Sequence, residues 1–285
     1  MQSHHPTSAA PIPSAAPPAL IQCADNPFGG LDQVSNANTA EVYWEALSWD
    51  EWGNVSGSER ASGAMQADRM FDPAVGHLDS IVTQRGATAI QSLSYAWDPV
   101  GNLDSREDGI QGIREAFEYD ALNRLDYSEL TAPAVSTFRN LDVSYDAAGN
   151  ITHKSDVGTY APSSRPHAPA SAGGASFVYD ANGNTTIGAG RSYTWSSFNK
   201  PVRIDANGAY SEFLYGPDRQ RIRQQRFGPN DHRLIYYVGA LYEEHHLAGG
   251  SVEQKHHIST PDGVWPSSPT APPSTCIRTT WAAST

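Results

Sequence analysis

The sequence has little charge, little lysine and no long apolar run. Charged side chains make up 18% of its 285 residues, below the roughly 25% of an ordinary globular protein, and lysine occurs only at Lys154, Lys200 and Lys255. The net charge is −12, so the chain lacks the excess of cations with which proteins bind phosphate backbones. No apolar run approaches the roughly 20 residues of a membrane helix. These shortages exclude a typical nucleic-acid-binding protein and a helical membrane span.

Cysteine is scarce as well, and both copies lie near the ends of the chain. Cys23 falls in residues 1–40, which begin with an Ala-, Pro- and Ser-rich stretch that has no signal-peptide pattern. Cys276 falls in residues 259–285, a divergent tail rich in Pro, Ser and Thr. Such segments bury too little apolar surface to offset the entropy of ordering. The sequence therefore predicts disorder in residues 1–40 and 259–285. A disulfide between Cys23 and Cys276 is the alternative, but two cysteines in such segments favour free thiols.

Glycine (24) and tyrosine (13) are plentiful, a composition typical of short strands joined by tight turns. The middle of the chain repeats one phrase: an aromatic residue, Asp, two variable residues, Gly or Asn, and usually Asn. The clearest copies contain Trp49, Asp50, Gly53 and Asn54; Trp97, Asp98, Gly101 and Asn102; Tyr119, Asp120 and Asn123; Tyr145, Asp146, Gly149 and Asn150; and Tyr179, Asp180, Gly183 and Asn184. A longer copy contains Phe71 and Asp72, and successive aspartates are 22, 26, 22, 26 and 34 residues apart. This spacing indicates a repeat architecture.

The phrase also predicts its own local structure. The aromatic residue and the residue two before it share one face of a strand. Asp suits the first position of a turn, where its carboxylate accepts backbone N–H groups. Gly suits the left-handed position that closes a hairpin with a bulge, and Asn tolerates that position next best. We therefore expect an all-β chain in which residues 41–258 form tandem antiparallel β-hairpins.

A functional role for the phrase aspartates is the alternative. Calcium loops concentrate several acidic ligands within a few residues, whereas each phrase offers one dependable carboxylate. We interpret the phrase residues as turn-forming, and predict no catalytic, metal-binding or cofactor-binding residue among them.

Two other clusters contain residues that could carry chemistry. His245, His246, His256 and His257 lie near Glu243, Glu244 and Glu253, but they lack a zinc-site spacing, and neighbouring residues of a strand face opposite ways. Arg219, Arg221 and Arg223 recur at a strand's period of two, which suits either an anion site or a charged face paired with Asp and Glu. Exposed histidines and a paired charged face are the interpretations that the sequence favours.

In these aromatic-Asp phrases the chain resembles the RHS/YD-repeat proteins, whose hallmark is a Tyr-Asp-x-x-Gly-Asn phrase. Residues 195–201, 215–219 and 236–243 are also similar to later segments of bacterial members. The resemblance covers about residues 41–264. It implies a strip of β-hairpins that spirals into a hollow shell, which in bacterial RHS toxins and insecticidal toxin complexes encloses a toxin and in teneurins serves adhesion.

The resemblance also sets the functional expectations. It implies a non-catalytic structural protein, secreted or at the cell surface, whose partners are toxin cargo or the remaining shell segments. The residues from Trp265 onward depart from the family, and the phrases are fewer than a closed shell requires, so we expect a truncated fragment. The alternative hypothesis is a cell-surface module that binds carbohydrate through exposed Tyr and Trp, such as Trp49, Trp97 or Trp195.

Overall fold

The computed structural model describes residues 21–132, 139–229, 231–261, 263–266 and 276–278. Every regular element among these residues is a β-strand, which confirms the all-β prediction. Within these ranges there is no helix with the length and apolarity that crossing a membrane requires.

The strands are short. They are β1 (Ile21–Asp25), β2 (Leu31–Asn36), β3 (Val42–Trp49), β4 (Val55–Arg60), β5 (Met65–Phe71), β6 (Leu78–Arg85), β7 (Thr88–Trp97), β8 (Leu103–Asp108), β9 (Ile113–Tyr119), β10 (Leu125–Thr131), β11 (Arg139–Tyr145), β12 (Ile151–Lys154), β13 (Gly158–Pro162), β14 (Pro169–Ala172), β15 (Ala175–Tyr179), β16 (Thr185–Gly188), β17 (Arg191–Trp195), β18 (Pro201–Ala206), β19 (Ala209–Tyr215), β20 (Arg221–Gly228), β21 (Asp231–Val238), β22 (Tyr242–Leu247), β23 (Val252–Thr260), β24 (Gly263–Pro266) and β25 (Cys276–Arg278).

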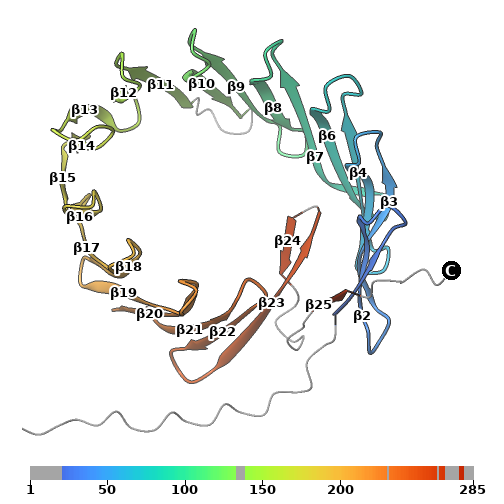
Figure 1. Cartoon of the computed structure of the whole chain (residues 1–285). Coiled ribbons are helices and arrows are strands. Elements are labelled where there is room, and N and C mark those ends of the chain that lie inside the picture. The colour runs from blue at the N-terminus through green and yellow to red at the C-terminus, as the bar shows by residue number, and fades with distance from the viewer. Residues whose placement is uncertain (1–20, 133–138, 230, 262, 267–275, 279–285) are drawn as a thin grey trace, which may run out of the picture.

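The topology is that of an open strip of hairpins. Each strand from β1 to β23 pairs antiparallel with the strand that follows it. β25 departs from this order and pairs in parallel with β1. The strip bends into a ring-like curve, so that β23 and β24 return toward the side of the ring where β2 and β25 lie (Figure 1).

The alternation of strand direction gives the strip two different borders. The connections that lead from odd- to even-numbered strands lie along one border, and all the aromatic-Asp phrases fall on it. We call this border the phrase rim. The even-to-odd connections form the opposite border, the plain rim, where several turns are short and contain glycine, as at Gly86, Gly190 and Gly208.

The best-buried part of the molecule lies at the N-terminal end of the strip. Val34 and Trp44 are each only 1% exposed, and they pack with Ile21, Cys23 and Val55. This cluster joins β1 and β2 to β3 and β4. Elsewhere the buried side chains form small groups, such as Ser58, Ala67 and Thr83 across β4–β6 and Ile235 with His245 across β21–β22, as expected of a sheet without a second layer packed over its whole length.

The strip extends beyond both ends of the predicted range, residues 41–258. Residues 21–36 form β1 and β2 rather than a disordered segment, because Ile21 and Val34 belong to the buried cluster. At the other end, β23 runs to Thr260 and is followed by β24. Residues 1–20, 267–275 and 279–285 lie outside the described residues, so the prediction for them is untested.

The expectation of free cysteines is also wrong for Cys23. This residue is disulfide-bonded and 6% exposed, and it lies on β1 within the core. The other cysteine of the sequence, Cys276, is on β25, the strand that pairs with β1. The prediction failed because it placed Cys23 in a disordered tail, where no packing would hold a partner strand.

Candidate functional site

The turn of each phrase is built around its aspartate, and Asp146 shows the pattern. One carboxylate oxygen, Oδ1, accepts the backbone N–H groups of Ala148 and Asn150, each at 2.9 Å. The other, Oδ2, accepts the Asn150 side-chain amide at 2.9 Å. The backbone closes the same loop, since Asp146 N–H donates to the Asn150 carbonyl and Gly149 N–H donates to the Asp146 carbonyl. Five short hydrogen bonds therefore fix one turn.

The same arrangement recurs along the rim. Asp50, Asp98 and Asp180 make the corresponding bonds with Asn54, Asn102 and Asn184. In the Asp120 turn, Arg124 replaces Asn and gives an ion pair of 2.6 Å. The residue before the final Asn or Arg has a positive φ in every copy: Gly53, Gly101, Asn123, Gly149 and Gly183. Asn123 thus occupies, at φ 57°, the position that glycine holds in the other turns.

These hydrogen bonds hold the aspartates in their charged form. The side-chain amides of Asn150 and Asn184, followed by backbone N–H groups, lower the pKa of Asp146 and Asp180 below the usual value. For Asp50 and Asp98, burial alone would raise the pKa, but the bonds from Asn54 and Asn102 and from the backbone lower it overall. A carboxylate that accepts several N–H groups favours ionisation, so these residues act as acceptors and not as proton donors.

From the Asp98 turn onward, the aromatic residue before a turn of the phrase rim connects that turn to the preceding one. Tyr145 Oη donates to the Leu125 carbonyl at 2.8 Å, and Leu125 is the first residue of the strand after the Asp120 turn. Equivalent bonds join Trp97 to Leu78, Tyr119 to Leu103, Tyr179 to Pro169, Trp195 to Thr185 and Tyr215 to Pro201. In each pair the acceptor begins the even-numbered strand that follows the previous turn of the phrase rim. We call this series the rim ladder.

The rim ladder explains why the phrase uses Tyr or Trp. Each carries an apolar ring and one N–H or O–H donor, whereas Phe has no donor. Burial raises the pKa of Tyr119 and of Tyr215 above the usual value, so these hydroxyls, which are protonated at neutral pH in any case, remain donors further into the alkaline range. Cations lie over two of these rings: Arg124 is 4.3 Å from the centre of the Tyr145 ring, and Lys200 Nζ is 5.4 Å from the centre of the Tyr215 ring. The rim ladder therefore ties neighbouring hairpins together beyond their strand pairing.

The structure also accounts for the 34-residue interval between Asp146 and Asp180. An additional hairpin, β13–β14, occupies it, and its phrase-rim turn has no Asp phrase. Ser163 organises that turn instead, accepting the Arg165 N–H at 3.0 Å and donating to the Ala168 carbonyl at 2.5 Å. Two short hairpins thus lie where the sequence suggests one long repeat.

One turn of the phrase rim was not predicted from the sequence. Asn26 accepts the N–H groups of Phe28 and Gly30 on its Oδ1 atom, at 3.0 and 2.9 Å. The Gly29 N–H donates to the Asn26 carbonyl, as in the aspartate turns. The signal was present in the Asn-Pro-Phe-Gly sequence, since Asn forms the same side-chain turn as Asp. Asn26 therefore begins the phrase rim ahead of Asp50.

The histidine cluster divides between the two faces of the sheet, as the alternation of strand residues predicts. His245 is only 5% exposed, so the expectation of exposed histidines is wrong for this residue. His245 Nε2 lies 2.7 Å from Glu243 Oε2 on one face, and His246 Nε2 lies 2.6 Å from Glu244 Oε1 on the other. Burial tends to raise the pKa of Glu244, but hydrogen bonds from Tyr242 and His246 lower it overall. No group of three or more His, Cys, Asp or Glu residues suited to a metal occurs within the described ranges.

The arginine run does not form a single charged face. Arg219 lies in the turn after β19, 5.5 Å from the centre of the Phe198 ring. Arg221 lies 4.4 Å from the centre of the Tyr237 ring. Nearby Arg226 pairs with Asp231 at 2.7 Å. Stacking on aromatic rings therefore replaces part of the ion pairing that the sequence favours.

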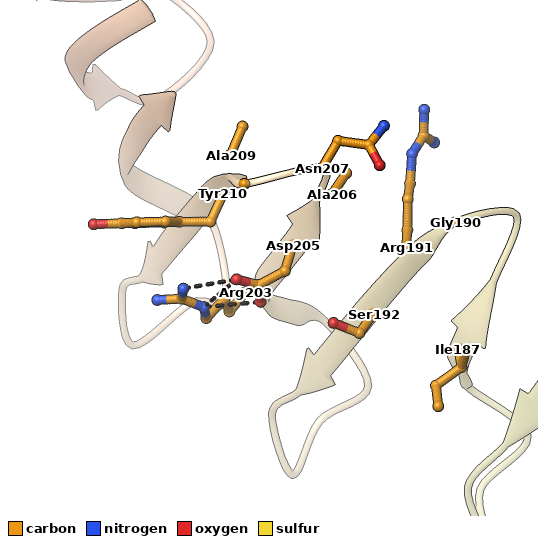
Figure 2. A pocket seen from close by; sticks show the side chains of 11 residues that line it. Ile187, Gly190, Arg191, Ser192, Arg203, Asp205, Ala206, Asn207, Ala209 and Tyr210 are labelled. Atoms are coloured by element: carbon orange, nitrogen blue, oxygen red, sulfur yellow. Dashed lines mark hydrogen bonds and ion pairs between the residues drawn. The ribbon is translucent and has the colours of Figure 1, made fainter. Parts of the chain in front are cut away.

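A shallow hollow of about 520 Å³ lies between β16 and β19 and is shown in Figure 2. Arg203 forms ion pairs with Asp205 at 2.7 Å and with Glu212 at 2.6 Å. Its guanidinium also lies 4.0 Å from the centre of the Tyr210 ring, on which Phe227 stacks at 5.2 Å. A sugar ring binds to a free aromatic face, and the Tyr210 ring is flanked by these two neighbours. The hollow therefore does not favour the carbohydrate hypothesis.

The tryptophans named for that hypothesis are engaged as well. The Trp97 ring lies 4.7 Å from the His77 ring, and its indole N–H belongs to the rim ladder. The Trp195 ring stacks with Tyr193 at 6.3 Å and makes the equivalent bond. Trp49 packs against the buried cluster of β1–β4. Carbohydrate binding thus stays a prediction for which these contacts provide no support.

Solved structures of other proteins contain a similar fold. No family model and no curated protein matches the chain. A structure of the Photorhabdus luminescens Tc holotoxin pore with a mutated TccC3 is similar over 83% of this chain, with a TM-score of 0.54 and 16% identity. A crystal structure of TcdB2-TccC3-TEV is similar over 81%, with a TM-score of 0.55 and 17% identity. The chain spans 15% of each matched chain. The resemblance to RHS/YD strips is therefore confirmed at the level of the fold.

Proposed function

We propose that this chain is a non-catalytic, structural segment of an RHS-type β-shell that encloses or delivers a toxin. The observation that carries the proposal is the rim ladder, which ties successive hairpins of a curved strip to one another. The similar solved structures are chains of Tc toxin assemblies, and this strip corresponds to a small share of their length. Its partners would be further shell segments and toxin cargo, in a protein that is secreted or lies at the cell surface.

The distribution of polar groups supports a wall more than an active site. The carboxylate oxygens of the phrase aspartates accept hydrogen bonds from N–H groups of their own turns, as at Asp146. The aromatic residues donate their O–H or N–H groups to backbone carbonyls, as at Tyr145. Enzymes instead hold titratable groups in a cleft with shifted protonation and an accessible reacting atom. A curved strip with saturated turns can enclose a volume while contributing no reactive group.

The experiment is deletion of the coding sequence in the producing organism, followed by an assay of toxicity toward susceptible target cells. Complementation with the wild-type chain should restore toxicity. The Tyr145→Ala chain, which loses one step of the rim ladder, should restore it less well. The His245→Gln chain should restore it fully if it folds, because no chemistry depends on the histidine.

Two results would contradict the proposal. Deletion without any effect on toxicity would remove the link to a toxin. Loss of toxicity in the folded His245→Gln chain, with folding checked by circular dichroism, would contradict a non-catalytic role.

A further inference from the structure

The steps of the rim ladder lie in notches between neighbouring hairpins. From β6 to β19, each even-numbered strand pairs with the next odd-numbered strand starting from its third residue, which leaves a notch between the two strands at the phrase rim. In six of these seven notches, a Tyr or Trp of the odd-numbered strand donates to the first carbonyl of the even-numbered strand. This donor always lies three positions beyond the last paired residue of its strand.

The notch between β12 and β13 is the exception, and we call it the β12–β13 notch. Its last strand pair joins His153 to Thr159, and the residue three positions further along β13 is Pro162. Proline has neither an aromatic ring nor a hydrogen-bond donor. The rim ladder therefore has a step at Tyr145 and a step at Tyr179, and Pro162 supplies none between them.

A cavity of about 550 Å³ occupies the β12–β13 notch. Ile151 and Thr152 line it on the β12 side, and residues 160–162 line it on the β13 side. Residues of the Asp146 turn and of the turn at 163–168 also line it. This volume lies within the usual range for a small-ligand site. The place of the missing ring is therefore a cavity at the phrase rim.

The exposure of Ile151, the first residue of β12, agrees with a missing ring. Ile151 is 36% exposed, whereas Leu103 and Leu125, which hold the same position beside filled notches, are half-buried. Apolar surface in contact with water favours a ligand that removes it from water. The β12–β13 notch thus keeps the apolar surface that a ring covers elsewhere in the rim.

The neighbouring steps define the group that fits. Tyr145 and Tyr179 each donate a hydroxyl to a backbone carbonyl at 2.8 Å. A phenol ring in the β12–β13 notch would meet the Ile151 carbonyl in the same way. Arg165 also lines the cavity, and an arginine beside a tyrosine ring already occurs in this rim, with Arg124 4.3 Å from the centre of the Tyr145 ring. An apolar wall, a carbonyl acceptor and a cation together suit a phenol.

We propose that the β12–β13 notch binds a tyrosine side chain of a partner polypeptide, whose hydroxyl donates to the Ile151 carbonyl and completes the rim ladder. All 13 tyrosines of this chain lie within the described ranges, each in a strand of its own strip. Tyr160 belongs to the wall of the cavity, at the position that Phe117 and Phe177 hold two residues before the other donors. The tyrosine that fills the notch therefore comes from another chain.

The test uses N-acetyltyrosinamide as the probe, titrated into the full chain with isotope-labelled isoleucine methyl groups and followed by NMR. The Ile151 methyl signal should shift with a dissociation constant on the order of 1 mM, as expected of a ligand of this size. N-Acetylphenylalaninamide, which lacks the hydroxyl donor, should bind about fivefold more weakly. Intermolecular nuclear Overhauser effects should place the probe ring next to Ile151.

Two variants at Pro162 form a matched pair. Pro162→Tyr supplies the missing ring from the chain itself, and should abolish binding of the probe. Pro162→Ala removes the proline but leaves the notch open, and should leave the dissociation constant unchanged. The Tm of Pro162→Tyr should exceed that of Pro162→Ala by about 3 °C, because the tyrosine regains a packed ring and its hydrogen bond.

Equal affinity for the two amides, unchanged binding in Pro162→Tyr or loss of binding in Pro162→Ala would each overturn the proposal. Overhauser effects that place the probe away from Ile151 in the wild-type chain would also overturn it, whether or not the variants fold. The inference rests on the geometry of the strip and not on the link to a toxin. Its failure would leave the proposed shell role standing, and an effect-free deletion would leave the notch standing.

Discussion

The two borders of the strip differ in how their turns are held. A phrase-rim turn such as that of Asp146 has a carboxylate that accepts three hydrogen bonds, and the neighbouring aromatic residue donates to the previous hairpin. A plain-rim turn such as Asn207-Gly208 depends on backbone conformation, with φ values of 49° and 77°. Both borders reverse the chain. The comparison indicates that the phrase is needed to bind one hairpin to the next, and not simply to make a turn.

The largest expected effect comes from removing one step of the rim ladder. Tyr145→Ala should lower the free energy of unfolding by about 3 kcal/mol, because a packed aromatic ring and its hydrogen bond are lost together. Tyr145→Phe, which removes only the bond to the Leu125 carbonyl, should cost about 1 kcal/mol. Urea unfolding followed by circular dichroism measures both.

Tyr236→Ala is the control for that series. This ring is 41% exposed on β21 and contacts the His246 ring at 5.6 Å, so its loss should cost less than the loss of Tyr145. Equal losses at the two positions would show that the rim ladder adds nothing to ordinary aromatic packing.

The next largest effect is a loss of Tm on removing an aspartate, and it should differ between the two borders. Asp146→Ala removes three hydrogen bonds, and should lower Tm by about 4 °C for a domain of this size. Asp108→Ala on the plain rim removes two, to the N–H groups of Ile110 and Gln111, and should lower Tm by about 2 °C. Differential scanning calorimetry measures the Tm of both variants. A larger decrease in Tm for Asp108→Ala than for Asp146→Ala would contradict the claim that the phrase-rim turn is held more firmly.

A smaller, graded effect should appear with acid. The folded-state pKa of Asp146 and Asp180 lies below the usual value, so these groups stabilise the fold above the unfolded-state pKa of about 3.9. That stability should be lost as the pH falls from about 4 through the lower folded-state pKa. The urea midpoint should be flat from pH 7 to 5 and then decline.

Asp146→Asn sharpens the acid experiment. Asn26 shows that an amide oxygen can accept the turn N–H groups, so this variant should keep its turn but lose one titrating group. Its urea midpoint should decline less between pH 4 and 3 than that of the wild type, since stability follows proton uptake. An identical decline in both chains would assign the acid sensitivity to other carboxylates.

The smallest effect is expected at Asn123, where the phrase has Asn in place of Gly. Asn123→Gly restores the common residue at a φ of 57°, but removes the acceptor of the Asn102 side-chain bond at 3.2 Å. These changes oppose one another, so the free energy of unfolding should move by less than about 0.5 kcal/mol. A loss above about 2 kcal/mol would mean that the contact between turns matters more than the turn conformation.

Local chemistry made the aspartate turns predictable from the sequence. Asp and Gly act within five residues of each other, so their spacing carries the geometry. The turn at Asn26 was missed because its acceptor is an amide, and the turn at Ser163 was missed because it lacks the phrase.

The rim ladder was beyond the reach of pattern reasoning. The bond from Tyr145 to Leu125 spans 20 residues, and depends on the register in which β10 pairs with β11. The disulfide of Cys23 likewise depends on a strand that pairs from the far end of the chain. Contacts of this kind follow from the assembled strip and leave no periodic signal of their own.

Hydrogen exchange of the full chain, read by mass spectrometry at single-residue resolution, tests the central claim most directly. The account predicts slow exchange of the turn N–H groups of Asp146, Gly149 and Asn150, which are bonded within the phrase turn. It predicts fast exchange in the plain-rim turn at Asn207 and Gly208, because local opening is easiest where few bonds hold the backbone. Equal protection of the two turns, or slower exchange at Asn207 and Gly208, would contradict it.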